Sequence, residues 1–140
     1  MEIEKITGRI AQDLEYLKQF TATPGEGCAR LPFTKEARDA VNYLREIMEE
    51  IGLEVHEDEA GNVIGILRGT DPDAPCVMSG SHYDSVIHGG NYDGIGGVVC
   101  SIEMARQIVE SGMEHKRDLV VVGFNDEEGM RFGTGYFGSC

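Results

Sequence analysis

Two short stretches of the chain, residues 79–94 and 125–129, hold the side chains that could do chemistry. Each stretch follows a run of apolar residues, and the candidate side chains are one imidazole and four carboxylates. These side chains belong to His82, Asp84, Asp93, Glu127 and Glu128. An imidazole combined with carboxylates is a ligand set that suits divalent metals such as zinc, manganese, cobalt and nickel. The residue types therefore predict a metal site.

The same residues indicate a division of tasks. A carboxylate has two oxygens and can bridge two ions, and Asp93 is the candidate bridge. We expect Asp84 to orient His82, either by accepting its second ring N–H or through the backbone. Metal binding lowers the pKa of a bound water toward about 7, so a nearby carboxylate can take its proton. We assign Glu127 as this catalytic base and Glu128 as a metal ligand.

Three segments show the spacing of apolar residues that is typical of amphipathic helices. They cover residues 3–20, 34–51 and 95–111. Thr34 is a suitable N-cap for the second helix, and Gly52 is a suitable stop. Residues 21–32, which contain two prolines and two glycines, are expected to form an irregular loop.

Four shorter apolar segments read as strands. They cover residues 53–57, 63–67, 76–78 and 119–124. The first two are separated by turn residues and predict a β-hairpin at a sheet edge. The last two flank the third helix, an order that predicts a right-handed βαβ crossover between parallel strands.

This crossover explains how distant residues could meet. The carboxyl ends of parallel strands open at the same edge of a sheet, where ligands bind in α/β proteins. The residues after 78 and those after 124 should therefore converge. The predicted fold class is α/β, with a βαβ crossover, an edge hairpin and helices on both faces of the sheet.

Composition bounds the remaining possibilities. With 140 residues, of which 41% are hydrophobic, the chain is long enough for one domain with a real core. A formal charge of −13 disfavours nucleic acid or an anionic membrane as a partner. The chain has no apolar run of membrane-spanning length, and we expect a soluble, cytoplasmic protein. The four cysteines form no C-x-x-C pair, and we expect Cys76 and Cys100 to be buried as small hydrophobes.

Three motifs in order resemble the M20-type metallohydrolases. They are Gly80–Val86, Gly89–Gly94 and Glu127–Phe132. Within that group the chain is similar to the amidase branch, which comprises N-carbamoyl-L-amino acid hydrolases, allantoate amidohydrolases and β-ureidopropionases. The resemblance implies part of a zinc-peptidase-like catalytic domain and a carbamoyl or ureido amino acid substrate.

The resemblance also implies a role for each residue of the site. His82 would bind one metal ion, Asp93 would bridge two ions, and Glu128 would bind the second. Glu127 would be the base that activates water, and Asp84 would orient His82. The two ions would be zinc, manganese, cobalt or nickel. A cis peptide bond after Asp93 is implied as well.

The chain departs from this family in length. Family members are much longer, with a lid and dimerisation domain and two further histidine ligands beyond the region matched here. We therefore expect residues 1–140 to be the N-terminal part of such a catalytic domain, either a truncated gene product or a deliberately shortened chain, and to be inactive or nearly so alone. The full-length family forms homodimers, and self-association of this shorter chain through newly exposed surface is a further expectation.

Two alternatives stay open at this point. One is a peptidase or acyl-amino acid hydrolase of the wider M20 group, against which the Arg131-Phe132 pair and the Gly89-Gly90 spacing argue. The other is a non-catalytic binding or assembly module that keeps the scaffold and has lost the chemistry. Failure of the folded chain to bind metal would favour the module.

Overall fold

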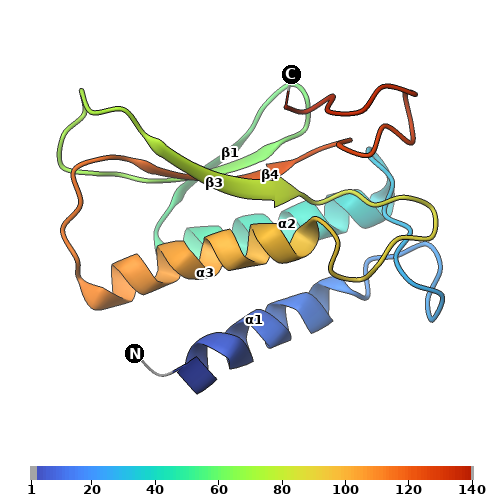
Figure 1. The fold of residues 1–140 in the computed structure, drawn as a ribbon, viewed down its shortest axis with the longest axis horizontal. Helices are drawn as coiled ribbons and strands as arrows, with labels where there is room; N and C mark the ends of the chain where they lie inside the picture. Colours follow the sequence, from blue (N-terminus) through green and yellow to red (C-terminus); the bar gives the residue numbers. More distant parts are fainter. Residues whose placement is uncertain (1–2, 140) are drawn as a thin grey trace.

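The computed structural model describes residues 3–139, which form a four-stranded sheet packed against helices (Figure 1). In chain order the elements are α1 (Ile3–Leu17), α2 (Lys35–Ile51), β1 (Glu54–Glu57), β2 (Val63–Leu67), β3 (Val77–His82), α3 (Ile95–Ser111) and β4 (Leu119–Phe124). The strand order across the sheet is β1-β2-β4-β3.

The sheet is mixed in direction. Strands β3 and β4 are parallel and are joined by α3, while β1 and β2 form an antiparallel hairpin at one edge. Strand β2 also pairs with β4 in antiparallel orientation. The α/β class, the βαβ crossover and the edge hairpin are therefore confirmed.

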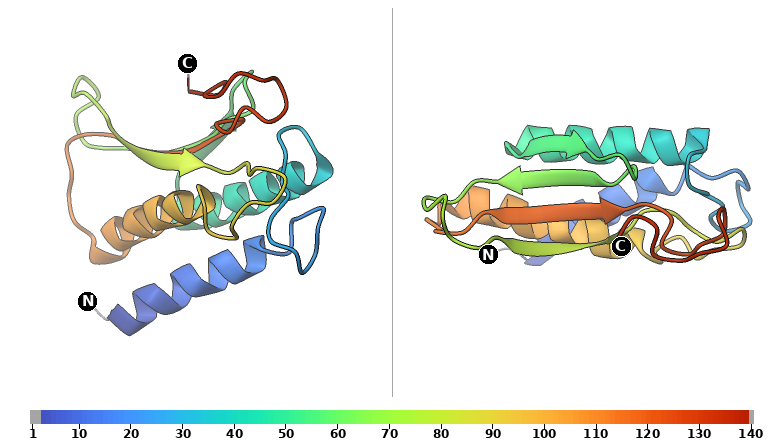
Figure 2. Two further views of the ribbon diagram at one scale, coloured as in Figure 1. Left: turned by 45° about the vertical axis from the view of Figure 1, so that its right-hand side comes forward. Right: turned by 90° about the horizontal axis from the view of Figure 1, so that it is seen from above.

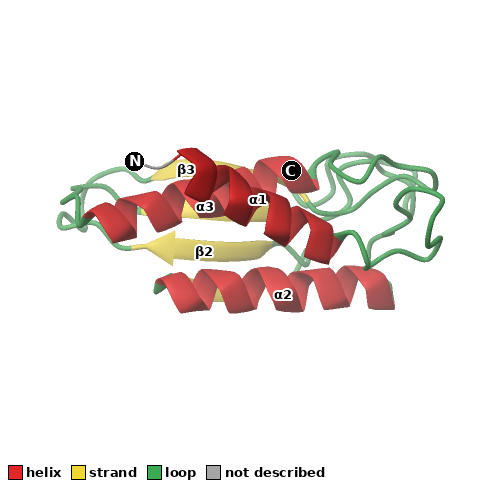
Figure 3. Cartoon of the chain, turned by 90° about the horizontal axis from the view of Figure 1, so that it is seen from below, coloured by secondary structure: helices red, strands yellow, loops and turns green. Residues whose placement is uncertain are grey.

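The layering of the helices differs from the expectation in one respect. All three helices lie on the same side of the sheet, and α1 packs against α3 as a further layer (Figures 1 and 2). Viewed from that side, the helices lie in front of the strands (Figure 3). Apolar periodicity shows that a helix has one buried stripe, but it does not say which face of a sheet the stripe covers.

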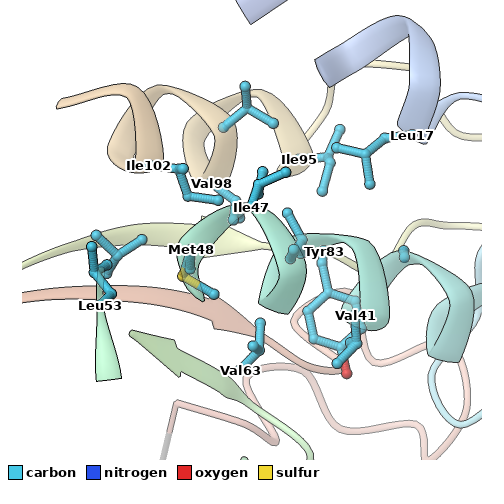
Figure 4. Close-up of a cluster of buried hydrophobic side chains, with 14 of the residues drawn as sticks. Leu17, Val41, Ile47, Met48, Leu53, Val63, Tyr83, Ile95, Val98 and Ile102 are labelled. Carbon is cyan, nitrogen blue, oxygen red and sulfur yellow. The ribbon is translucent and has the colours of Figure 1, made fainter. Parts of the chain in front are cut away.

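The core lies between the sheet and helices α2 and α3 (Figure 4). Its fully buried side chains include Val41, Leu44, Met48, Val63, Val98, Val99, Ile102 and Val121. Burying one such aliphatic side chain contributes about 1.5–3 kcal/mol. This packing fixes the crossover helix against both parallel strands and so fixes where those strands end.

The predicted boundaries of α2 are confirmed by its caps. The Thr34 hydroxyl accepts a hydrogen bond from the backbone N–H of Ala37 at 3.2 Å. Gly52 ends the helix with a left-handed backbone, at φ 98°. Helix α1 ends earlier than expected, at Leu17, and the following residues form a turn.

The prediction for two cysteines is wrong. Cys76 and Cys100 are both exposed. Cys76 precedes β3 instead of lying within it, and Cys100 lies on the outward side of α3. Across residues 3–139, no helix combines the length and the apolar character needed to cross a bilayer.

A buried ionic cluster joins α1 to α3. The Glu103 carboxylate, which is buried, accepts hydrogen bonds from Arg9, Arg106 and Gln107. Burial alone would raise the pKa of Glu103, but these three donors outweigh burial and hold it below its ordinary value of 4.5. The carboxylate therefore stabilises the folded chain above pH 4.5, and its contribution is lost as the pH falls through the lower, folded-state pKa.

We predict that Glu103→Gln lowers the free energy of unfolding by about 2 kcal/mol at pH 7, because it leaves two partly buried guanidinium groups without their shared anion. Urea denaturation checks this prediction. The difference in free energy of unfolding between Glu103→Gln and the unchanged chain should shrink below pH 4.5. Glu110→Gln is the matched control: Glu110 also pairs with Arg9 but is exposed, so its loss should matter much less. Equal effects of the two substitutions would contradict the cluster's role.

Candidate metal centre

The tips of β3 and β4 bring the predicted site residues to one edge of the sheet. His82 is the last residue of β3 and is in register with Phe124, the last residue of β4. The loop after β3 returns to the same edge before α3 begins, and the loop after β4 starts there with Asn125. The convergence expected from parallel strands is therefore present in the structure.

Three of the predicted residues form a compact group of ligand atoms. His82, Asp93 and Glu128 each offer one ligand atom, and these atoms all lie within 4.8 Å of one another. The Nε2 atom of His82 is 3.7 Å from an Asp93 carboxylate oxygen. One imidazole nitrogen and two carboxylate oxygens at this spacing fit a divalent transition metal.

Glu127 lies at the border of this group. One of its carboxylate oxygens is 3.9 Å from His82 Nε2, and the side chain is partly exposed. The side chain is thus close enough to reach a water molecule held at the group, and solvent can still reach the carboxylate.

Asp84 makes contacts that the sequence did not indicate. Its carboxylate is completely buried and accepts the backbone N–H of Glu127 at 3.1 Å and that of Glu128 at 3.3 Å. The side chain that follows β3 therefore holds the backbone that follows β4. Two amide donors on one carboxylate fix both glutamates relative to His82.

The orientation of His82 is set mainly through the backbone. Its Nδ1 atom lies 2.9 Å from the carbonyl oxygen of Asp84, whereas the Asp84 carboxylate is 3.6 Å away. A carbonyl oxygen can only accept, so Nδ1 carries the hydrogen and donates it. Nε2, which faces Asp93 and Glu127, is then the nitrogen that can bind a metal.

Gly94 allows the loop to pack against the imidazole ring. Its φ is 69°, and a Cβ atom there would lie 2.3 Å from His82 Cε1. Only glycine fits both the backbone and the space. The cis peptide that the resemblance implied after Asp93 is not found, because residues 3–139 contain no cis peptide bond.

Asp126 is a buried acid that the sequence analysis missed. It is completely buried, its φ is 54°, and neither carboxylate oxygen has a hydrogen-bond partner among residues 3–139. Burial, followed by the nearby charge of Asp84, raises the pKa of Asp126. The only signal in the sequence was its place directly before the glutamate pair.

The electrostatics of the site reflect this concentration of acids. The pKa of His82 is raised to about 9, chiefly by the Asp84 carboxylate, with burial acting in the opposite direction. Burial raises the pKa of Glu128, and the neighbouring acids add to this shift while His82 opposes it. A cation at the group would relieve the repulsion among these carboxylates.

Comparison with known proteins places this geometry in a family. A family model described as peptidase family M28 matches residues 62–139. This range is more than half of the chain and contains all five predicted site residues. The chain belongs to peptidase family M28. The motifs resembled the M20-type metallohydrolases, whereas the family model that matches is that of M28.

Several relatives of this M28 chain are named as amidohydrolases. It is 43% identical over 131 residues to the N-carbamoyl-L-amino-acid amidohydrolase of Pseudomonas sp. (strain NS671), which is 94% of this chain and 32% of the relative. The corresponding enzyme of Geobacillus stearothermophilus is 44% identical, with the same coverage. The allantoate amidohydrolase of Bacillus subtilis (strain 168) is 38% identical over 141 residues, covering 99% of this chain and 34% of the relative.

Solved structures agree. A hydantoinase/carbamoylase family amidase from Burkholderia ambifaria matches 94% of this M28 chain and 33% of its own, with a TM-score of 0.90 at 31% identity. The chain spans about a third of the length of the relatives it matches. The resemblance to the amidase branch is confirmed.

We predict that His82 of the metal-free protein titrates near pH 9 and that Asp84→Asn moves its midpoint toward the ordinary 6.5. Because the folded-state pKa is the higher one, the His82–Asp84 interaction stabilises fully below pH 6.5 and is lost as the pH rises through 9. NMR of the imidazole resonances in the presence of a chelator measures both midpoints. Asp71→Asn, in an exposed loop, is the control. A midpoint unchanged by Asp84→Asn would contradict the electrostatic coupling.

Proposed function

We propose that this chain supplies the metal-binding and water-activating part of an amidohydrolase that cleaves a carbamoyl or ureido C–N bond. One observation carries the proposal: His82, Asp93 and Glu128 meet at the strand tips with Glu127 beside them. The names of the relatives support a substrate of the N-carbamoyl-L-amino acid or allantoate class.

Each residue has a task in the proposed reaction. His82, through Nε2, and the Asp93 and Glu128 carboxylates would hold a divalent metal, while Asp84 orients His82 and the glutamate backbone. When bound, the metal polarises the substrate carbonyl and lowers the pKa of the attacking water. Glu127 takes the proton of that water as its oxygen adds to the substrate carbon, and returns the proton to the departing nitrogen when the C–N bond breaks.

The number of ligands limits what this chain does alone. Three protein ligands would suffice for one catalytic metal, but a second ion would need further ligands. We therefore propose that the complete two-metal site draws on parts of the relatives that this chain does not match. The expected lid and dimerisation domain, the homodimer, self-association and the cytoplasmic location stay predictions.

A peptidase is the second candidate, because the matching family model is named for peptidases. Both reactions break an amide-type C–N bond with an activated water, so the residues of the site do not separate them. The relatives named as amidohydrolases, at 38–44% identity, favour the carbamoyl substrate. The third candidate, a non-catalytic module, requires that the folded chain bind no metal.

The proposal can be tested in a chimera. Residues 3–139 replace the matched third of the Geobacillus stearothermophilus relative, and turnover is measured in the presence of manganese. Ammonia release is followed with N-carbamoyl-L-amino acids and allantoate, and release of free amino acids is followed with a dipeptide. We expect turnover of a carbamoyl or ureido substrate. Glu127→Gln should reduce it about 10²–10⁴-fold with the metal still bound, because only the base is lost.

Glu114→Gln, an exposed substitution away from the site, is the control and should leave turnover unchanged. Turnover of the dipeptide alone would favour the peptidase. A folded, metal-loaded chimera in which Glu127→Gln has no effect would contradict the role of this chain.

A further inference from the structure

Arg30 is a buried cation that the proposed reaction does not use. It is only 2% exposed and is the largest fully buried side chain. Its Nε donates to the carbonyl oxygen of Tyr83 at 2.7 Å. Its Nη1 donates to the carbonyl oxygens of Leu17 at 3.1 Å and Phe20 at 3.2 Å. The guanidinium thus joins the end of α1 to the residue that follows β3.

The backbone around Arg30 is also hydrogen-bonded to the segment that follows β3. The Arg30 N–H donates to the Ser85 hydroxyl at 2.8 Å, and the Ser85 N–H donates to the Arg30 carbonyl oxygen at 3.0 Å. Two residues earlier, Cys28 and Gly89 exchange a pair of backbone hydrogen bonds at 2.9 Å each. The irregular loop predicted over residues 21–32 is confirmed, and its hydrogen bonds also hold the loop between β3 and α3.

A neutral side chain could fill this space and donate to carbonyl oxygens, so the charge itself requires an explanation. Burying a guanidinium is costly unless hydrogen bonds and an opposite charge compensate it. Burial lowers the pKa of Arg30, and nearby groups, Asp84 among them, act in the opposite direction. Tyr83, whose carbonyl oxygen accepts from Arg30, and Asp84, whose carboxylate accepts the Glu127 and Glu128 amides, are consecutive residues.

We propose that Arg30 is a positioning residue for the metal centre: it fixes the segment Tyr83–Ser85 so that the Asp84 carboxylate can hold the Glu127 and Glu128 amides. This inference rests on the proposed function for its consequence, but the contacts themselves do not depend on it. Arg30 reaches no ligand directly, and it acts through Tyr83 and Asp84.

The test uses Arg30→Lys, which keeps the charge without the planar fork, and Arg30→Met, which removes both. Native-state hydrogen exchange, followed by NMR, reports the protection of each backbone amide. We expect the Glu127 and Glu128 amides to lose about tenfold or more of their protection in Arg30→Met, and less in Arg30→Lys. The amides of β1 and β2 should change much less.

The affinity of each variant for Mn²⁺ is measured alongside. Loss of a group that orients a metal ligand typically lowers metal affinity about 10–100-fold, and we expect Arg30→Met to lower Mn²⁺ affinity about 10-fold. Ile102→Val, a core change remote from residues 83–85, controls for general destabilisation and should leave the affinity for Mn²⁺ unchanged. Ser85→Ala removes the hydrogen bond between the Arg30 N–H and the Ser85 hydroxyl. It is the substitute variant if Arg30→Met does not fold.

The outcomes separate the two proposals. Selective loss of protection at Glu127 and Glu128 supports the positioning role, whether or not the unchanged chain binds Mn²⁺. Failure of the unchanged chain to bind Mn²⁺ overturns the proposed function alone. Unchanged protection in the folded variants, or an equal loss at these amides and throughout the sheet, overturns the role of Arg30.

Discussion

The structure of the site depends on one buried carboxylate that joins two strand tips. Asp84 follows β3, and its oxygens accept the backbone amides of Glu127 and Glu128, which follow β4. Parallel pairing brings the tips to the same edge, but pairing alone leaves the loops free to diverge. The Asp84 carboxylate fixes the loop after β4 with two charge-assisted hydrogen bonds. The Asp84 backbone carbonyl oxygen orients the His82 ring toward the same site.

This arrangement concentrates negative charge at the tips of β3 and β4. Asp84 and Asp126 are completely buried, and His82 lies among carboxylates from both loops. Such a site favours cations, as the raised pKa of His82 at about 9 indicates. A divalent ion satisfies the same acids without requiring them to be protonated. Metal binding and the local geometry are thus two consequences of the same charges.

Much of this could be predicted from the sequence because it follows from local patterns. Apolar spacing gave the helices, Thr34 and Gly52 gave the caps of α2, and the strand-helix-strand order brought His82 toward Glu128. The contacts of Asp84 with the glutamate amides and of Arg30 with Tyr83 could not be predicted, because they are tertiary and join residues more than 40 positions apart. The side of the sheet that the helices cover also escaped prediction, since periodicity carries no information about it.

The central claim is that His82, Asp93 and Glu128 bind one shared metal ion. X-ray diffraction from crystals of this chain soaked with zinc, with data collected at the zinc absorption edge, tests it most directly. The account predicts an anomalous peak at about 2.0–2.2 Å from His82 Nε2 and from one carboxylate oxygen each of Asp93 and Glu128. Zinc bound only elsewhere, with these three side chains still grouped together, would contradict it.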